Sequence, residues 1–200
     1  LIFIEVMNKK CFSFLYFYER RIRRILPALL FVMMVSFPFA WLVLLPKNFV
    51  NYSESILYSL GFSSNFYFHY TGQQYASENS LLLPFLHTWS LSVEEQFYIA
   101  YPIFILIIYR FLSKYLFVFL LIGFVASLLF AHWASQSHPS FNFYIILSRG
   151  WELLAGCILA FLEISYNREA KKNLRSSIFT IIGLIMILYA IIFFDDNILH

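Results

Sequence analysis

Residues 25–45 read ILPALLFVMMVSFPFAWLVLL and contain no charged side chain. A hydrocarbon layer about 30 Å thick is crossed by about 20 mostly apolar residues in a helix. The stretch therefore has the length and composition of a membrane-spanning helix. Lipid offers backbone N–H and C=O groups no hydrogen-bond partner, so a single segment that crosses it must be helical.

The composition of the whole chain extends this prediction beyond one segment. Of its 200 residues, 61% are hydrophobic, 22% aromatic and only 12% charged, and the mean hydropathy is +0.73. A typical globular domain is about half apolar and about a quarter charged. The composition excludes a water-soluble enzyme, a disordered chain and a free nucleic-acid-binding protein. We expect an all-α fold, a polytopic bundle of transmembrane helices.

Four further apolar stretches bring the expected number of spans to about five. They cover residues 96–109 (extended at the start by 89–95), 115–133, 141–164 and 176–194. The stretch 52–68 is shorter and contains several serines and asparagines and one glutamate. We expect a re-entrant or interfacial helix there, in addition to the five spans.

The distribution of basic residues supports this count. Lys and Arg near the ends of spans favour the cytoplasmic side. Arginines at 20–24 precede the first span, the loop 70–88 contains no Lys or Arg, and 168–175 is strongly basic. If 52–68 does not cross, both basic stretches lie inside. The start of the 89–109 segment, with Glu94, then lies at the outer face.

The first candidate site is the sequence YERRIRRILP at residues 18–27. On a helix, Arg21 and Arg24, or Arg20 and Arg24, share a face. Two such guanidinium groups can each bind a phosphate through two hydrogen bonds. From the residues alone, the favoured interpretation is a topology anchor that touches anionic lipid headgroups.

The second candidate is HTWSLSVEEQFY at residues 87–98. If the helix begins early, His87, Ser90 and Glu94 line one face and offer an imidazole, a hydroxyl and a carboxylate for proton transfer. Alternatively, Ser92 to Glu95 form a capping box, with both acids in a helix's first turn. The residues leave both interpretations open, and one acid can serve each purpose.

The third candidate is SRGWELLAG at residues 148–156, where Arg149 and Glu152 are spaced to pair within one helix. Ionisable residues inside a membrane are functional candidates, and these two form either a structural ion pair or part of a substrate path. Cys11 and Cys157 lie far apart, and no metal-ligand spacing surrounds them. We therefore expect no metal site.

Together the three blocks resemble the acyltransferase-3 family of integral membrane O-acyltransferases. More narrowly, they resemble its bacterial branch that acetylates O-antigen and other surface polysaccharides. The blocks occur in the family's order and at its usual separations. The resemblance implies a multi-pass protein of the bacterial inner membrane. It also implies transfer of an acyl group, usually acetyl, from acyl-CoA to a hydroxyl of a cell-envelope polysaccharide or lipopolysaccharide. The implied partners are the lipid bilayer and a glycan or lipid-linked saccharide, with no nucleic acid.

The resemblance also implies roles for individual residues. The family's RxxR motif falls on Arg21 and Arg24, and these two with Arg20 are expected to bind the acyl-CoA donor. Its serine–glutamate motif falls on Ser90 or Ser92 with Glu94 or Glu95. With the helix-face argument added, the candidate catalytic residues are His87, Ser90, Ser92, Glu94 and Glu95.

One family feature does not occur in this sequence. In members of the family, the first span carries an Arg or Lys, ten intervening residues and then a His that is taken as the catalytic one. We therefore expect residues 1–200 to be part of a transmembrane domain whose first spans, later spans and any SGNH-hydrolase-like domain lie elsewhere. We expect the piece alone to be inactive. The alternative function is a transporter or flippase for a glycan or lipid intermediate, with Arg149 and Glu152 along its path.

Overall fold

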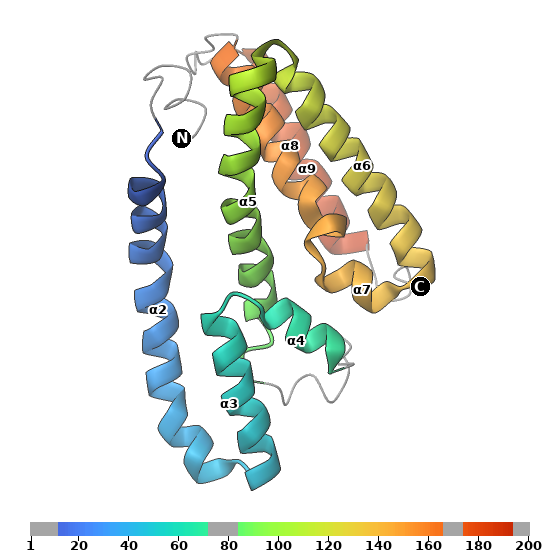
Figure 1. The fold of residues 1–200 in the computed structure, drawn as a ribbon. Coiled ribbons are helices and arrows are strands. Elements are labelled where there is room, and N and C mark those ends of the chain that lie inside the picture. The colour runs from blue at the N-terminus through green and yellow to red at the C-terminus, as the bar shows by residue number, and fades with distance from the viewer. Residues whose placement is uncertain (1–11, 72–83, 166–173, 194–200) are drawn as a thin grey trace. The chain divides into compact units, whose positions relative to one another are not determined.

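The structure, a computed structural model, describes residues 12–71, 84–165 and 174–193, and in these ranges the regular elements are all helices (Figure 1). The all-α prediction is confirmed. The chain divides into two compact units, Leu1–Leu162 and Glu163–His200. In the second, α9 (Leu174–Phe193) is a 20-residue apolar helix over the predicted span 176–194. Cys11 and the basic residues at 168–172 lie outside the described ranges.

The first span is longer than the sequence indicated. Helix α2 (Phe14–Val43) has 30 residues and begins at Ser13, whose Oγ accepts a hydrogen bond from the backbone N–H of Tyr16. A helix of this length extends about 45 Å, more than the roughly 30 Å of hydrocarbon. The arginine cluster therefore belongs to the same continuous helix as the apolar stretch.

Two short helices occupy the stretch for which we predicted one. Helices α3 (Pro46–Leu60) and α4 (Ser64–Tyr70) contain 15 and 7 residues, so neither has the length of a span. Between them, Ser63 N donates to Tyr58 O and Phe62 N to Ser59 O, the pattern of a Schellman cap. Phe62 takes the left-handed conformation (φ 49°) that glycine usually supplies. The single helix predicted over 52–68 was therefore wrong.

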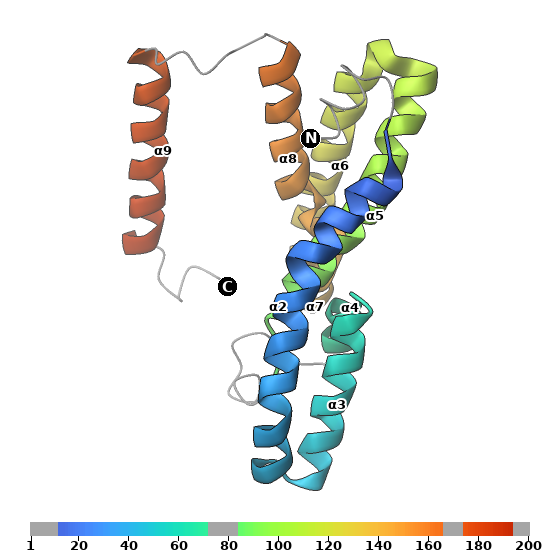
Figure 2. The same cartoon turned by 90° about the vertical axis from the view of Figure 1, so that its left-hand side faces the viewer.

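Helices α5 (Thr88–Leu112) and α6 (Leu116–Ser137) run antiparallel to each other around the short turn η2 (Ser113–Tyr115), as both views show (Figures 1 and 2). They match the spans predicted at 96–109 and 115–133. In the described residues, three stretches have the length and composition to cross a membrane. These are Phe14–Val43, Thr88–Ser137, which contains the α5–α6 pair, and Pro139–Ser165.

The last of these stretches is interrupted. Helix α7 (Pro139–Tyr144) is followed by one extended residue, Ile145 (φ −96°, ψ 140°), and then by α8 (Ile146–Ser165). The continuous span predicted over 141–164 was wrong in this respect. Carbonyl groups at the end of a helix have no partner within it. Those of Phe143 and Tyr144 accept hydrogen bonds from Arg149 and Asn65 instead.

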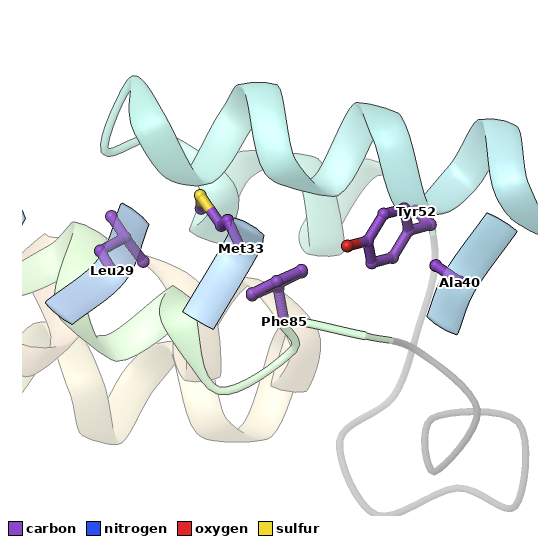
Figure 3. Packing of buried hydrophobic residues seen from close by; sticks show 5 residues of the cluster. All are labelled: Leu29, Met33, Ala40, Tyr52 and Phe85. Carbon is purple, nitrogen blue, oxygen red and sulfur yellow. The ribbon is translucent and has the colours of Figure 1, made fainter. Parts of the chain in front are cut away.

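An apolar cluster holds α2 against α3 and against the segment that leads into α5 (Figure 3). Its buried members are Leu29, Met33, Ala40, Tyr52 and Phe85. Tyr52 is almost completely buried, and its hydroxyl shares a 2.9 Å hydrogen bond with Ser36 Oγ on α2. The cluster therefore also satisfies the phenol that it buries.

A second interface, between α4 and α5, is polar. On α5, Thr88, Ser92 and Gln96 are spaced four residues apart and therefore share one face. Ser64 Oγ lies 3.0 Å from Thr88 Oγ1 and 2.8 Å from Ser92 Oγ, and Ser59 Oγ lies 2.7 Å from Thr88 Oγ1. We call the residues of this interface the polar seam: Ser59, Ser64, Asn65, Thr88, Ser92 and Gln96.

An amide pair closes the polar seam. Gln96 Nε2 donates to Asn65 Oδ1 (2.9 Å) and to Phe62 O (2.9 Å), while Asn65 Nδ2 donates to Tyr144 O (3.1 Å). Asn65 is completely buried. Because these bonds are directional, they fix the rotation of α5 about its axis as well as its position.

We expect Gln96→Leu to destabilise the protein by about 1–3 kcal/mol, because Asn65 loses a buried partner. Thermal unfolding of the purified protein in detergent measures the effect. Gln136→Leu makes the same substitution at an exposed position on α6 and should change stability by no more than about 0.5 kcal/mol. Equal effects of the two substitutions would contradict a stabilising role for the seam.

Tyr67 on α4 contacts two residues of α3. Its hydroxyl donates to Glu54 Oε2 (3.2 Å), and its ring stacks on that of Tyr58 at 4.8 Å. Burial, followed by the hydrogen bond and charge of the Glu54 carboxylate, raises the pKa of Tyr67 to about 12 from 10.0. Burial and the Glu54 carboxylate both favour the neutral phenol over the tyrosinate. The stability from this pair is therefore complete below pH 10.0 and is lost as the pH rises toward about 12.

We expect the tyrosinate absorbance titration of the wild type, minus that of Tyr67→Phe, to show a midpoint near 12. In Glu54→Gln the midpoint should move toward 10.0, because the charge that opposes ionisation is gone. An unchanged midpoint in Glu54→Gln would show that the carboxylate has no part in the shift.

Candidate active site

The first and second sequence blocks meet at an ion pair between α2 and α5. Arg21 Nη1 lies 3.3 Å from Glu95 Oε1, and the side chains are 25% and 9% exposed. The guanidinium carbon sits 3.0 Å from the ring centre of Tyr98 and 5.1 Å from that of Phe17. Arg21 is therefore held by a carboxylate and two aromatic faces, an arrangement that suits a planar guanidinium.

The other arginines of the cluster are placed differently. Arg20 lies over the ring of Tyr16 at 4.3 Å, Arg23 pairs with Glu19 at 2.7 Å, and Arg24 is exposed. Arg21 is hydrogen-bonded to α5 through Glu95. Arg20 and Arg24, four residues apart, share one face of α2.

Of the two interpretations left open for this block, the capping box over Ser92 to Glu95 does not form. Helix α5 begins at Thr88, so Ser92 lies in its second turn, and its Oγ accepts a hydrogen bond from Ser64 N in the polar seam. Phe85 turns the chain into the helix with a left-handed backbone (φ 63°), and Thr88 Oγ1 donates to Phe85 O. The early helix start that the proton-transfer interpretation required is therefore present.

The second and third blocks meet in a small pocket between α5 and α8. Its lining residues are Trp89, Ser90, Val93, Glu94, Arg149, Glu152 and Leu153. Ser90 and Glu94 lie one turn apart on α5 and are exposed, as the helix-face argument predicted. His87 was predicted to share that face, but it does not line the pocket. It precedes the helix, and its carbonyl oxygen accepts a hydrogen bond from Ser90 Oγ.

Arg149 is fixed at the wall of this pocket. Its Nη1 lies 2.9 Å from Glu152 Oε1, which confirms the pairing predicted from their spacing. Its Nε donates to Phe143 O at 3.4 Å, and its guanidinium lies 5.3 Å from the Trp89 ring and 5.1 Å from that of Phe143. Contacts from three directions keep the group in place while it remains 31% exposed.

The two adjacent glutamates therefore have different surroundings. Glu95 is buried and belongs to the ion pair with Arg21. Glu94 is exposed and lines the pocket with Arg149 and Glu152. Successive residues on a helix point about 100° apart, because about 3.6 residues make a turn. One helix can thus contact α2 and α8 through neighbouring side chains.

The predicted depths of these residues need correction. The charge distribution placed the arginines at the cytoplasmic face and Glu94 at the outer face. An ion pair of 3.3 Å between Arg21 and Glu95 requires that both lie at the same depth. The two helices cross obliquely (Figure 2), and Arg21 on α2 therefore lies at the depth of Glu95 on α5.

Helix α8, which carries Arg149 and Glu152 of the pocket, is hydrogen-bonded to α6. Ser127 Oγ on α6 accepts a hydrogen bond from Trp151 N (2.9 Å) and donates to Leu147 O (2.6 Å). A Cβ atom at Gly150 would lie 3.3 Å from Ser127 Oγ, so glycine permits this close approach. Ser127, Trp89 and the Asn65–Gln96 pair were not among the candidates that the sequence indicated. The four-residue spacing of Thr88, Ser92 and Gln96 was the signal that could have revealed the seam.

In the described part of the chain, no group of three or more His, Cys, Asp and Glu side chains gathers where it could hold a metal ion. The chemistry available in the pocket is that of carboxylates, a hydroxyl and a guanidinium: proton transfer and hydrogen bonding.

The family model described as an acyltransferase domain matches residues 2–199. The chain belongs to this acyltransferase family. It is therefore an acyltransferase enzyme by family, and its long apolar helices fit a multi-pass membrane protein. The resemblance seen in the three sequence blocks is confirmed.

Three relatives illustrate the similarity. An uncharacterized protein of Haemophilus influenzae is 32% identical over 206 residues, which cover 98% of this chain and 82% of that protein. The peptidoglycan O-acetyltransferase OatA of Listeria monocytogenes is 32% identical over 185 residues, or 88% of this chain and 29% of OatA. The O-acetyltransferase OatA of Staphylococcus aureus is 28% identical, over 81% of this chain and 27% of that protein.

The chain thus spans less than a third of the two named O-acetyltransferases. No solved structure matches it.

We expect Arg21→Leu to destabilise the protein by about 2–3 kcal/mol, because Glu95 keeps a largely buried charge without its partner. Arg24→Leu, at an exposed position on the same helix, should cost no more than about 0.5 kcal/mol. Thermal unfolding in detergent compares the two. The double variant Arg21→Leu/Glu95→Leu should recover part of the loss, since no unpaired charge remains. Additive losses would argue against a direct pair.

Proposed function

We propose that this acyltransferase moves an acyl group, acetyl by preference, from acyl-CoA to a hydroxyl of a cell-envelope polysaccharide or lipopolysaccharide in the bacterial inner membrane. The observation that carries the proposal is the α5–α8 pocket, where Ser90 and Glu94 lie with the Arg149–Glu152 pair. Family membership and the similarity to two proteins named O-acetyltransferases support it.

In the proposed reaction, Glu94 is the general base. It is the acid of its block that is open to a ligand, because Glu95 is paired with Arg21 and largely buried. Glu94 takes the proton of the acceptor hydroxyl as the hydroxyl oxygen attacks the thioester carbonyl of acyl-CoA. The new ester C–O bond forms, the C–S bond breaks, and the CoA thiolate leaves and takes up a proton.

The remaining candidates take supporting roles in this proposal. Ser90, one turn before Glu94 and bonded to His87 O, lies where it can hydrogen-bond the acceptor. Ser92 is buried in the polar seam and orients α5. These positions favour Glu94, with Ser90 beside it, over Ser92, Glu95 and His87 as the group that moves the proton.

The donor is assigned to the arginine cluster. The phosphates of CoA are multiply charged anions, and guanidinium groups bind them through paired hydrogen bonds. Arg20 and Arg24 lie one turn apart on α2, Arg20 partly exposed and Arg24 exposed, and Arg21 between them in sequence pairs with Glu95. After pairing with Glu95, Arg21 still has a buried Nε without a hydrogen-bond partner among the described residues.

We expect Glu94→Gln in the full-length protein to reduce O-acetylation of surface polysaccharide at least about 100-fold, because general-base catalysis typically contributes that much. Proton NMR of the purified polysaccharide measures the acetyl content, and immunoblotting confirms equal protein levels. Glu19→Gln removes an exposed carboxylate from α2 and serves as the matched control.

Full acetylation by Glu94→Gln would remove Glu94 from the reaction. If deletion of the gene left acetylation intact but changed glycan export or chain length, the protein would be a transporter instead, with Arg149 and Glu152 on its path.

A further inference from the structure

We infer that the α5–α8 pocket is the acceptor subsite, that it takes an uncharged saccharide, and that the Arg149–Glu152 pair selects for it. This inference rests on the proposed function and concerns the same site. In the sequence, the pair is open to a purely structural interpretation. The structure adds that both side chains line a pocket and that both remain partly exposed, at 31% and 45%.

The charge of the pocket indicates that it binds the acceptor and not the donor. The ionisable residues of the pocket are Glu94, Glu152 and Arg149, so two negative charges and one positive charge give a formal net charge of −1. A site with this balance disfavours the phosphates of CoA and any acceptor that carries its own carboxylate or phosphate. The basic residues at positions 20–24 offer the donor a more favourable site on another helix. A neutral polyol is the substrate partner that the pocket suits.

The ion pair supplies the hydrogen bonds that a polyol needs. Neighbouring sugar hydroxyls each act as donor and acceptor, and a guanidinium beside a carboxylate offers both complements. Arg149 uses Nη1 for Glu152 and Nε for Phe143 O, which leaves further N–H groups on its exposed edge. Glu152 uses Oε1 in the pair, and its Oε2 is the second acceptor of the same carboxylate.

Trp89 acts through Arg149. Its ring lies 4.5 Å from that of Phe143, and the guanidinium of Arg149 lies over it at 5.3 Å. The two aromatic rings and the Phe143 carbonyl keep Arg149 at the pocket wall without consuming the edge that a ligand would use. We therefore assign Trp89 as a positioning residue and Arg149 and Glu152 as the residues that contact the acceptor.

The competing interpretation is a structural ion pair three residues apart on one helix. Such exposed pairs typically contribute little to stability. A pair that acts only through the bond between its two side chains should work equally well with its charges exchanged, whereas a binding pair should not. The charge exchange Arg149→Glu/Glu152→Arg therefore distinguishes the two, because it keeps the pair and the net charge but moves the donor and the acceptor groups.

The experiment measures acetyl transfer from radiolabelled acetyl-CoA in membrane vesicles that contain the full-length protein. The acceptor is polysaccharide from the deletion strain, varied in concentration. We expect Glu152→Gln to raise the acceptor KM about tenfold, because one charge-assisted hydrogen bond to the acceptor is lost. The acetyl-CoA KM should stay unchanged. The charge-exchanged variant should fail to restore the acceptor KM. Glu19→Gln, from an exposed ion pair on α2, is the matched control.

Acceptor charge provides a second measurement. The wild type should prefer a neutral oligosaccharide to one of equal length that bears carboxylates, and Glu152→Gln should reduce that preference at least about tenfold by removing a negative charge. An unchanged acceptor KM in Glu152→Gln, or full recovery in the charge-exchanged variant, would overturn the inference. Absence of any transfer from acetyl-CoA by the wild type would instead overturn the proposed function.

Discussion

The arrangement of this protein depends on the hydrogen bonds of the polar seam, through which hydroxyl and amide groups join α5 to α3 and α4. Apolar packing between membrane helices is non-directional. It also gains little from burial, because lipid is as apolar as leucine. The bond between Asn65 and Gln96 is directional, and Asn65 is completely buried. It sets the rotation of α5, and that rotation decides which helix each glutamate of the second block contacts.

Charge pairing then places the helices at a common depth. Intramembrane charges are costly unless they are paired or face a cavity. Glu95 meets this requirement through Arg21 of α2, and Arg149 through Glu152 and two aromatic rings. Glu94 differs because it lines the pocket and remains exposed. The catalytic proposal therefore rests on the contrast between two adjacent carboxylates with different neighbours.

Much of the fold could be predicted from the sequence, because lipid imposes length and composition on spans such as residues 25–45. The pairing of Arg149 with Glu152 followed from helix geometry, since the two lie three residues apart on one helix. The depth of Glu94 and the continuity of 141–164 were predicted wrongly, and the capping box could not be decided, for one reason. Each depended on a contact distant in sequence: Ser92 with Ser64, Arg21 with Glu95, and Asn65 with Tyr144. Local periodicity contains no information about such partners.

The single extended residue between α7 and α8 has a consequence for how variation in this enzyme is constrained. It ends α7 at Tyr144, shortly before Arg149 of the pocket wall, and the successive carbonyl groups of Phe143 and Tyr144 accept hydrogen bonds from side chains outside that helix. One accepts from the seam and the other from Arg149. The extended residue Ile145 thus affects both the polar seam and the pocket. A substitution that joined α7 and α8 into one continuous helix would change both. Sequence drift at this position is limited by geometry even though no catalytic side chain lies there.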